Sequence, residues 1–525
     1  MVIYNPPVKD YEFLFNEVFD IIPIIQKLGY EEMDSDFLTM LMEGWADHTT
    51  NVWLPINQLG DKIGIRYEDG LVKSPKEFRD AYHKGVESGW LSTSCKEEHG
   101  GMGVPVFFQA VTWAEFGTAT NMALSVLPAL TTGVYEVLTE HGDEHLVDYF
   151  APEIGKATWA GTMCLTEPHA GTDLGMISTK ATPREDGSYS VSGTKIFITY
   201  GEHDITENIV HLVLAKTPDA PEGTKGISLF LVPKYLPSEW KTGTLEGISS
   251  SLRKEVNGIS CSGSEEKMGL HASPTCVINF ENSIGWRVGD LHDGMPLMFQ
   301  MMNRERLATG MMGIGLAEIA YQNALSWVKD RRQGRDLNGI KDPNHKADNI
   351  LVHPDVRRML LEAKVNNEGC RALATWTGLL LDQIKSEDNK ESERAQALLD
   401  LFTPIVKAHF TDLGCETVST CMQVMGGAGY CSEYGVEQFY RDVRISKIWE
   451  GTNGIQALDL AGRKITQNMG KNLRYLLWPL TKFIEDNREI PEMEEFNKPL
   501  YQGVKGLQQL TLLMISQGQA NPHFL

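Results

Sequence analysis

One glutamate, Glu450, stands in a segment of this sequence that is well suited to proton transfer. Ile448 and Trp449 precede it and Gly451 follows it directly. Burial among apolar groups disfavours a charged carboxylate and raises its pKa. A carboxylate whose pKa lies near the working pH is suited to act as a general base. Gly451 allows the backbone to turn or to approach a ligand closely. The same pattern is also typical of an ordinary, partly buried glutamate at the start of a helix.

A second candidate acid or base, Glu305, lies in the segment Asn303-Arg-Glu-Arg306, inside the methionine-rich run 295–312. Arginines flank it on both sides in the sequence. We expect their guanidinium groups to lower the pKa of Glu305 and to weaken it as a base. An arginine–glutamate pair near a helix surface is the alternative interpretation.

Two further segments offer groups that suit a flat, phosphate-bearing ligand. The loop 164–175 has hydroxyls at Thr166 and Thr172, and Gly171 leaves backbone N–H groups accessible, so it can cradle a polar ring edge and a pyrophosphate. In the expected strand 195–199, Phe197 and Thr199 fall on the same side and can face a heterocycle. A polar turn and an ordinary half-buried strand are the alternatives.

The elements that must position these residues follow from the apolar spacing. Apolar residues at three- and four-residue intervals predict helices in the first 155 residues, at 13–28, 34–46, 107–130 and 136–150, the last ending before Pro152. Short β-like runs follow at 189–192, 195–199, 209–214, 227–232 and 276–280. Helices return at 296–333, 354–386, 392–424, 433–446 and 454–469, and then in the tail. The order predicts an α+β protein with a β module between two helical blocks.

Composition and motif context exclude several classes of protein. The 525 residues carry a net charge of −22, which disfavours nucleic-acid binding. The eight cysteines include no CxxC pair, so we predict reduced thiols, a cytoplasmic setting and no metal site. No transmembrane helix and no secretory signal are expected. Gly426-Gly-Ala-Gly429 follows a helix rather than a strand, so it is not a dinucleotide-binding fingerprint.

Together these segments resemble the acyl-CoA dehydrogenase family, because five motifs occur in the family's order. They are Thr166 to Asp173, Phe197-Ile-Thr199, Arg331 to Arg335, Gln423 to Gly427 and Glu450-Gly-Thr452. The match covers roughly residues 35 to 470 and is greatest to the longer members, which carry an extra C-terminal helical domain. The resemblance implies an N-terminal helical domain, a central β-barrel domain and a C-terminal four-helix bundle. The implied ranges are an extension (1–35), a helical domain (36–158), a barrel (159–290), a bundle (291–470) and an extra, incomplete helical segment (471–525).

The resemblance also implies FAD as cofactor and an acyl-CoA thioester as substrate. The implied cofactor-binding residues are Cys164, Leu165, Thr166, Gly171, Thr172, Phe197, Thr199, Arg331, Gln333, Gln423, Gly426, Gly427 and Thr452, of which Gln423, Gly426 and Gly427 serve a second subunit's FAD. Asn303, Arg306 and Gly451 are implied at the substrate, and Glu450 is the implied base, with Glu305 as the alternative.

The function that follows is removal of the α proton by Glu450 while a hydride leaves the β carbon. The longer bacterial members resembled most act on 3-methylmercaptopropionyl-CoA, so that substrate is expected. An electron-transfer flavoprotein as electron acceptor and a homodimer are also implied. The alternatives are a medium- or long-chain acyl-CoA substrate, an oxygen-using flavoenzyme such as an acyl-CoA oxidase, and a non-enzymatic scaffold. A purified protein without colour would favour the last.

Overall fold

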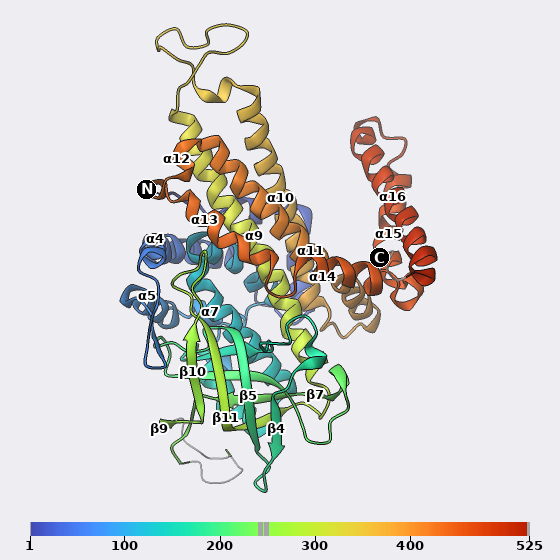
Figure 1. Cartoon of the computed structure of the whole chain (residues 1–525). Coiled ribbons are helices and arrows are strands. Elements are labelled where there is room, and N and C mark those ends of the chain that lie inside the picture. Colours follow the sequence, from blue (N-terminus) through green and yellow to red (C-terminus); the bar gives the residue numbers. More distant parts are fainter. Residues whose placement is uncertain (1, 240–244, 246–250, 522–525) are drawn as a thin grey trace.

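The computed structural model describes residues 2–239, 245 and 251–521. Helices form the first block, strands the second and helices the third, in the predicted order (Figure 1). The last four residues of the predicted C-terminal segment lie outside the described residues.

The first block is helical and also carries one small hairpin. Its helices are α1 (Val8–Phe13), α2 (Ile21–Lys27), α3 (Ser35–His48), α4 (Leu54–Ile63), α5 (Lys76–Glu87), α6 (Val106–Phe108), α7 (Ala114–His141) and α8 (Glu144–Gly155). The hairpin pairs β1 (Arg66–Glu68) with β2 (Leu71–Lys73). The run Val106–His141 is long and apolar enough to cross a membrane, but 83% of its most apolar window is buried inside the protein, as in a core helix.

Two of the helices predicted in this block are wrong in their limits. The helix expected at 13–28 is interrupted, because Asp20 adopts a left-handed backbone with φ +45° between a π turn at 14–18 and α2. The helix expected at 136–150 is divided between α7 and α8. Pro152 does not end α8 and lies within it.

The central block is a closed sheet. Its strands are β3 (Trp159–Cys164), β4 (Lys180–Pro183), β5 (Tyr189–Thr199), β6 (Asn208–Lys216), β7 (Ile227–Pro233), β10 (Ile259–Ser264) and β11 (Thr275–Val288), and β8 (Tyr235–Pro237) pairs separately with β9 (Leu252–Val256). The sheet follows the order β10-β11-β5-β4-β6-β3, and β7 pairs with both β6 and β11. That double pairing closes the ring β11-β5-β4-β6-β7 into a barrel. The two short strands predicted at 189–192 and 195–199 are one strand, β5.

The third block is built on long helices. They are α9 (Gly294–Asp330), α10 (Pro354–Gln383), α11 (Asn389–Met425), α12 (Gly427–Tyr430), α13 (Val436–Val443), α14 (Asn453–Asp459), α15 (Gln467–Asp486) and α16 (Glu494–Ala520). The boundary expected after residue 470 falls inside α15. In Figure 1 the pair α15–α16 stands apart from the bundle.

Glycines bring α9 and α11 into close contact. A Cβ atom added at Gly310 would lie 2.9 Å from the backbone oxygen of Val406, and one added at Gly313 would lie 2.6 Å from that of Phe410. Any side chain at these positions would push the helices apart. The N-terminal segment is attached to the same helix: the side-chain amide of Asn323 accepts from the Ile3 N–H at 3.0 Å and donates to the Ile3 carbonyl at 2.8 Å. All eight cysteines are free thiols, as predicted.

Candidate active site

Glu450 lies in a tight turn between a 3-10 turn at 444–447 and α14. Its backbone is left-handed, with φ +55°, and Gly451 follows with φ +83°. A residue other than glycine rarely adopts this backbone conformation and is strained in it. Three contacts from buried side chains hold the turn. Gln456 Nε2 donates to the carbonyls of Glu450 and Gly451 at 3.2 and 3.3 Å, and Arg306 Nε donates to the Glu450 carbonyl at 3.4 Å.

One oxygen of the Glu450 carboxyl group is buried and unpaired, although the residue as a whole is partly exposed. Its Oε2 atom has no hydrogen-bond partner among the described residues. Burial raises the pKa of Glu450 to about 6, while the charges of Arg306 and Lys407 act in the opposite direction. The predicted direction is therefore confirmed. Ile448, one of the apolar flanks on which the prediction rested, is half exposed, so the burial comes from tertiary packing.

Glu305 is also buried, and the prediction for its pKa is wrong. The side chain is 4% exposed, and its Oε1 atom has no partner in the described part of the chain. Burial, followed by the charge of Glu450, raises its pKa to about 8, and Arg304 offsets only part of this. A Cβ atom at Gly133 of α7 would lie 3.2 Å from Oε1, so the absence of a side chain there makes room for the carboxyl.

The two arginines beside Glu305 have other partners. Arg304 forms an ion pair with Glu136, and its Nη2 donates to Gln109 Oε1 at 2.7 Å. Arg306 packs over the Phe299 ring, with its guanidinium carbon 5.4 Å from the ring centroid. On a helix, neighbours in sequence point about 100° apart, so adjacency does not produce pairing.

The two carboxyls thus belong to one site, since the charge of Glu450 acts directly on the pKa of Glu305. Of the residues predicted at the substrate, Arg306 and Gly451 lie at the Glu450 turn. Asn303 joins them through a 3.5 Å contact from Arg306 Nη1 to its Oδ1. Thr452 caps α14 by accepting from the Ile455 N–H at 3.4 Å.

The loop that begins with Leu165 and Thr166 is fixed from inside the barrel. Lys195 is fully buried and its Nζ donates to the Leu165 carbonyl at 2.9 Å and to Glu167 Oε1 at 3.0 Å. Glu167 in turn accepts from the backbone and hydroxyl groups of Ser178 and Thr179 at 2.6–3.0 Å. A buried charge pair with every oxygen satisfied holds one defined geometry.

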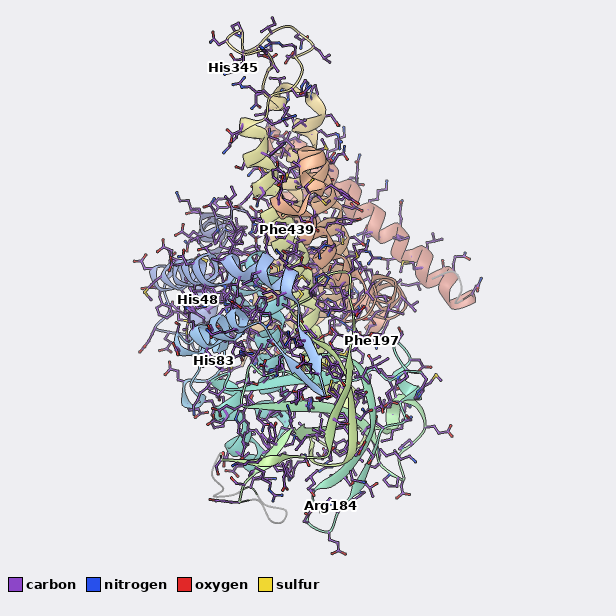
Figure 2. The ribbon with its side chains drawn as sticks, turned by 60° about the vertical axis from the view of Figure 1, so that its left-hand side comes forward. His48, His83, Arg184, Phe197, His345 and Phe439 are labelled. Atoms are coloured by element: carbon purple, nitrogen blue, oxygen red, sulfur yellow. The ribbon has the colours of Figure 1, made fainter. Side chains whose placement is uncertain are left out.

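A bulge in β5 turns Phe197 outward. Pairing with β11 shifts register between Lys195 and Ile198, and Phe197 adopts φ +58° with its side chain 58% exposed. Figure 2 labels Phe197 at the end of the barrel nearest the C-terminal helices. An exposed aromatic in strained backbone, two residues before Thr199, fits the flat ring system that the sequence predicts there. The Cys164 side chain lies inside the barrel, 3.8 Å from His211 Nδ1, so only its backbone can meet a cofactor.

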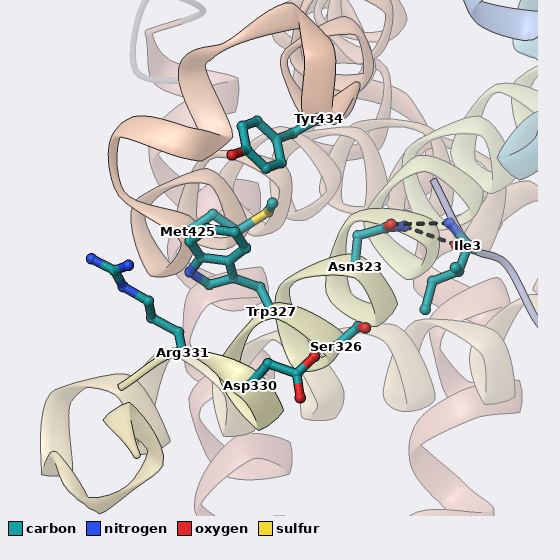
Figure 3. Close-up of a pocket in the computed structure, with 8 residues that line it drawn as sticks. All are labelled: Ile3, Asn323, Ser326, Trp327, Asp330, Arg331, Met425 and Tyr434. Atoms are coloured by element: carbon teal, nitrogen blue, oxygen red, sulfur yellow. Dashed lines mark hydrogen bonds between the residues drawn. The ribbon is translucent and has the colours of Figure 1, made fainter. Parts of the chain in front are cut away.

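The other predicted cofactor residues lie at the far end of α9. Arg331 follows the last residue of α9 and lines a pocket of about 360 Å³ with Trp327, Met425 and Tyr434 (Figure 3). A second pocket, of about 440 Å³, is lined by Gln423, Gly426, Gly427, Ser419, Met422, Tyr430 and Tyr440. Apart from its chain neighbours and the nearby backbone of its own helix, no atom of the described residues lies within 4 Å of a Cβ atom built on Gly426 or Gly427, which leaves the backbone open to a ligand.

One chain therefore brings the predicted cofactor residues into two separate groups. The barrel group lies near the start of α9, where Gly294 packs against Ser228 of β7. The second group lies at the opposite end of this 37-residue helix, which is about 55 Å long at 1.5 Å per residue. Figure 1 shows the barrel and α12 at opposite ends of α9.

Sequence reasoning did not identify Lys407 or Asn453. Lys407 of α11 is fully buried, and its Nζ donates to Asn453 Oδ1 at 2.9 Å. A signal was present, because Lys407 directly follows the run Leu401–Val406, in which Thr403 is the one polar residue, and precedes Ala408. A lysine on an apolar helix face is rarely buried without a role.

Comparisons with known proteins agree with this geometry. Residues 162–283 match the family model described as acyl-CoA dehydrogenase, middle domain, and residues 292–465 match acyl-CoA dehydrogenase, C-terminal domain. The chain is 41% identical to the 3-methylmercaptopropionyl-CoA dehydrogenase of Ruegeria pomeroyi over 90% of this chain and 78% of that relative. It is 36% identical to the broad-specificity linear acyl-CoA dehydrogenase FadE5 of Mycobacterium tuberculosis, over 92% of this chain and 78% of that relative.

Solved structures share the fold. Caenorhabditis elegans ACDH-11, in complex with C11-CoA, superposes with a TM-score of 0.77 at 20% identity, over 98% of this chain and 83% of that chain. Butyryl-CoA dehydrogenase from Megasphaera elsdenii gives a TM-score of 0.65 at 22% identity, over 82% of this chain and 99% of that chain. With the identities above, these findings establish that the chain belongs to the acyl-CoA dehydrogenase family, FAD-dependent oxidoreductases that act on the CH–CH bond of acyl-CoA thioesters.

Proposed function

We propose that this enzyme oxidises 3-methylmercaptopropionyl-CoA to the 3-methylthioacryloyl thioester, with Glu450 as the base. The observation that carries the proposal is the buried, unpaired carboxyl oxygen of Glu450, whose pKa of about 6 suits proton transfer near neutral pH. The 41% identity to the relative from Ruegeria pomeroyi supports the substrate.

In this proposal Glu450 removes the α proton through its unpaired carboxylate oxygen. An α C–H bond is too weakly acidic without polarisation of the thioester carbonyl. The backbone N–H of Glu450 donates to no acceptor within the described residues, and the left-handed turn fixes its direction. It can therefore donate to the thioester oxygen, as in an oxyanion hole. FAD, when bound, accepts the hydride that leaves the β carbon.

In this proposal the apolar side chains near the base would exclude water. Trp449 precedes the base, and α9 contributes the buried Met298, Met301 and Met302. Excluding water strengthens the hydrogen bonds and charge interactions on which the proton transfer depends. Asn303 and Arg306 would bind the substrate beside this turn.

We further propose a homodimer in which each FAD spans two subunits. In one chain the barrel, which carries Thr166, Phe197 and Thr199, and α12, which follows Gln423, lie toward opposite ends of α9 (Figure 1). The pocket lined by Gln423 and Gly427 in one chain would then lie beside the barrel residues of the other chain, and the two together would hold one FAD. An electron-transfer flavoprotein would take the electrons, as the resemblance implies, and the expected setting is cytoplasmic.

A straight-chain acyl-CoA is the second candidate substrate. FadE5, by its name, acts on linear acyl-CoA esters, and a butyryl-CoA dehydrogenase of Syntrophomonas wolfei is 34% identical over 92% of this chain and 79% of that relative. Because a sulfur and a methylene differ little in volume, an apolar pocket separates the two by only about 1–3 kcal/mol.

Anaerobic bleaching of the flavin tests the substrate. We expect the highest kcat/KM for 3-methylmercaptopropionyl-CoA and a lower but measurable value for valeryl-CoA, which replaces the sulfur with a methylene. A kcat/KM far higher for palmitoyl-CoA would reject the assignment. Mixing the reduced enzyme with air separates a dehydrogenase, which should reoxidise slowly with ligand bound, from an oxidase.

A further inference from the structure

The turn that carries Glu450 is attached to α11 on both sides. Before the base, Lys447 forms an ion pair with Asp412 at 2.6 Å. After it, Asn453 is held by four groups of α11: it accepts from Lys407 Nζ at 2.9 Å and donates to the Ala408 carbonyl, Thr411 Oγ1 and Asp412 Oδ1 at 2.9–3.1 Å. Four residues of α11, all within 407–412, therefore set the position of the base.

Lys407 is unusual among these groups because it is a buried cation without a carboxylate partner. Its side chain is fully buried, and its Nζ takes part in no ion pair among the described residues. Asn453 Oδ1 is the acceptor that the structure shows for it. A buried ammonium is costly unless a nearby negative charge offsets it.

Glu450 is the negative charge that acts most strongly on the pKa of this lysine. Burial lowers the pKa of Lys407 to about 8, and the charge of Glu450 acts against that change more strongly than the charge of Asp412. In the other direction, Arg306 and Lys407 are the two charges that lower the pKa of Glu450. The charged groups around the base are therefore Glu305 and Arg306 from α9, Lys407 and Asp412 from α11, and, acting on Arg306, Asp459 at the end of α14 and Arg463 just beyond it.

We infer that Lys407 is a positioning residue for proton abstraction: it anchors the Glu450 turn through Asn453, and its buried positive charge favours the ionised form of the Glu450 carboxyl before the substrate proton is taken. The inference rests on the proposed role of Glu450 as base. The anchor and the charge are separable, because a glutamine at position 407 can still donate to Asn453 but carries no charge.

The test is the pH dependence of flavin reduction at saturating 3-methylmercaptopropionyl-CoA, measured by anaerobic stopped flow on FAD-loaded enzyme. For Lys407→Gln and Lys407→Met we expect the midpoint of the acid limb to move up by about one pH unit, the smaller end of the shift that a nearby charge produces. With the base pKa moving from about 6 to about 7, the rate at pH 6 should then fall about fivefold. Asn453→Ala should lower the limiting rate and leave the midpoint in place.

Two control variants define the outcome. Lys390→Gln, an exposed lysine on the same helix, should match wild type throughout. Lys407→Arg keeps a cation and should keep the wild-type midpoint. An unchanged midpoint in Lys407→Gln with its flavin bound, or an equal displacement in Lys407→Arg, would overturn the inference. Glu450→Gln distinguishes failure of this inference from failure of the base assignment. If that variant still bleaches with substrate, both the base assignment and the inference about Lys407 are rejected. If it does not bleach and the Lys407 variants keep the wild-type midpoint, only the inference about Lys407 is rejected.

Discussion

At the level of single residues, two buried carboxyls share the site and differ in their protonation near neutral pH. With a pKa of about 6, Glu450 is largely ionised at pH 7, and with a pKa of about 8, Glu305 is largely protonated. A protonated carboxyl cannot accept the α proton. The structure thus gives a new reason to prefer Glu450 as the base, namely that Glu305 is protonated. The reason expected from the sequence, that the neighbouring arginines lower the pKa of Glu305, does not apply.

The first prediction separates the two carboxyls by isosteric substitution. Glu450→Gln should retain bound FAD but fail to bleach with substrate, because loss of a positioned base costs at least about 10²–10⁴ in kcat. Glu305→Gln should keep most of the wild-type rate, since an amide resembles the protonated carboxyl. Single-turnover flavin reduction measures both. An active Glu450→Gln beside an inactive Glu305→Gln would transfer the role of base to Glu305.

The second prediction concerns stability against pH. The pKa of Glu305 rises from an ordinary value of 4.5 to about 8 on folding, so between these values the folded state holds a proton that the unfolded chain has released. Its contribution to stability is full below about pH 4.5 and is lost as pH rises through 8. Glu305→Gln removes this dependence and should be more stable than wild type at pH 8, by about 1–3 kcal/mol for an unpaired buried group. Thermal unfolding of FAD-loaded enzyme at pH 5 and pH 8 measures the difference, and equal gains at both pH values would contradict it.

At the level of elements, strand β5 positions the loop that we propose to face the flavin, through one buried ion pair. Lys195 holds the Leu165 carbonyl and Glu167 together, and Glu167 holds Ser178 and Thr179. The pair is charged inside the barrel, so its net contribution to stability is small while it is intact. Removing one partner leaves an uncompensated charge, which is strongly destabilising.

The third prediction follows from this difference in stability between an intact and a broken buried ion pair. Lys195→Met should lower the free energy of unfolding by about 3–5 kcal/mol and weaken FAD binding, because the loop loses its anchor. Lys180→Met, an exposed lysine on the neighbouring strand β4, is the matched control and should change neither property. The double variant Lys195→Met with Glu167→Gln should recover part of the lost stability, since no charge is then left buried. Denaturant unfolding and FAD titration provide the two readouts, and a fully stable Lys195→Met would refute the anchoring role.

At the level of the whole molecule, the two groups of cofactor residues lie at opposite ends of α9. A site shared between subunits has a consequence that a site within one chain lacks. Consider a dimer in which one chain carries a disabling substitution in its barrel group of cofactor residues and the other chain carries one in its pocket group. Both substitutions then fall in the same FAD site, and the second FAD site stays intact.

The fourth prediction uses this complementation. Phe197→Asp should disable the barrel side and Gly427→Glu the pocket side, and each homodimer should lose FAD. Co-expressed chains carrying different affinity tags, purified through both tags, should regain about half of the wild-type flavin content and activity, since one of two sites is intact. A mixed dimer with no flavin, or a monomer with full activity, would reject the shared site.

The sequence by itself determined the order of the three blocks and the identity of the base candidate. Apolar spacing is a local property, so it predicts long helices such as α10 and α11 and short strands such as β6. The motif Glu450-Gly-Thr452 is local as well, and Gly451 at φ +83° occupies a turn that needs glycine. Interruptions without a strong local signal, such as the left-handed Asp20, were not predicted.

Only the tertiary structure decided which charges meet. Glu305 and its flanking arginines are adjacent in the sequence, yet the arginines bind Glu136 and the Glu450 turn, and the carboxyl is left unpaired. Lys407 lies 43 positions from the base in the chain and acts on it because Asn453 attaches the Glu450 turn to α11. Burial and charge are set by what surrounds a group in space, and pKa follows from those surroundings rather than from the neighbours in sequence.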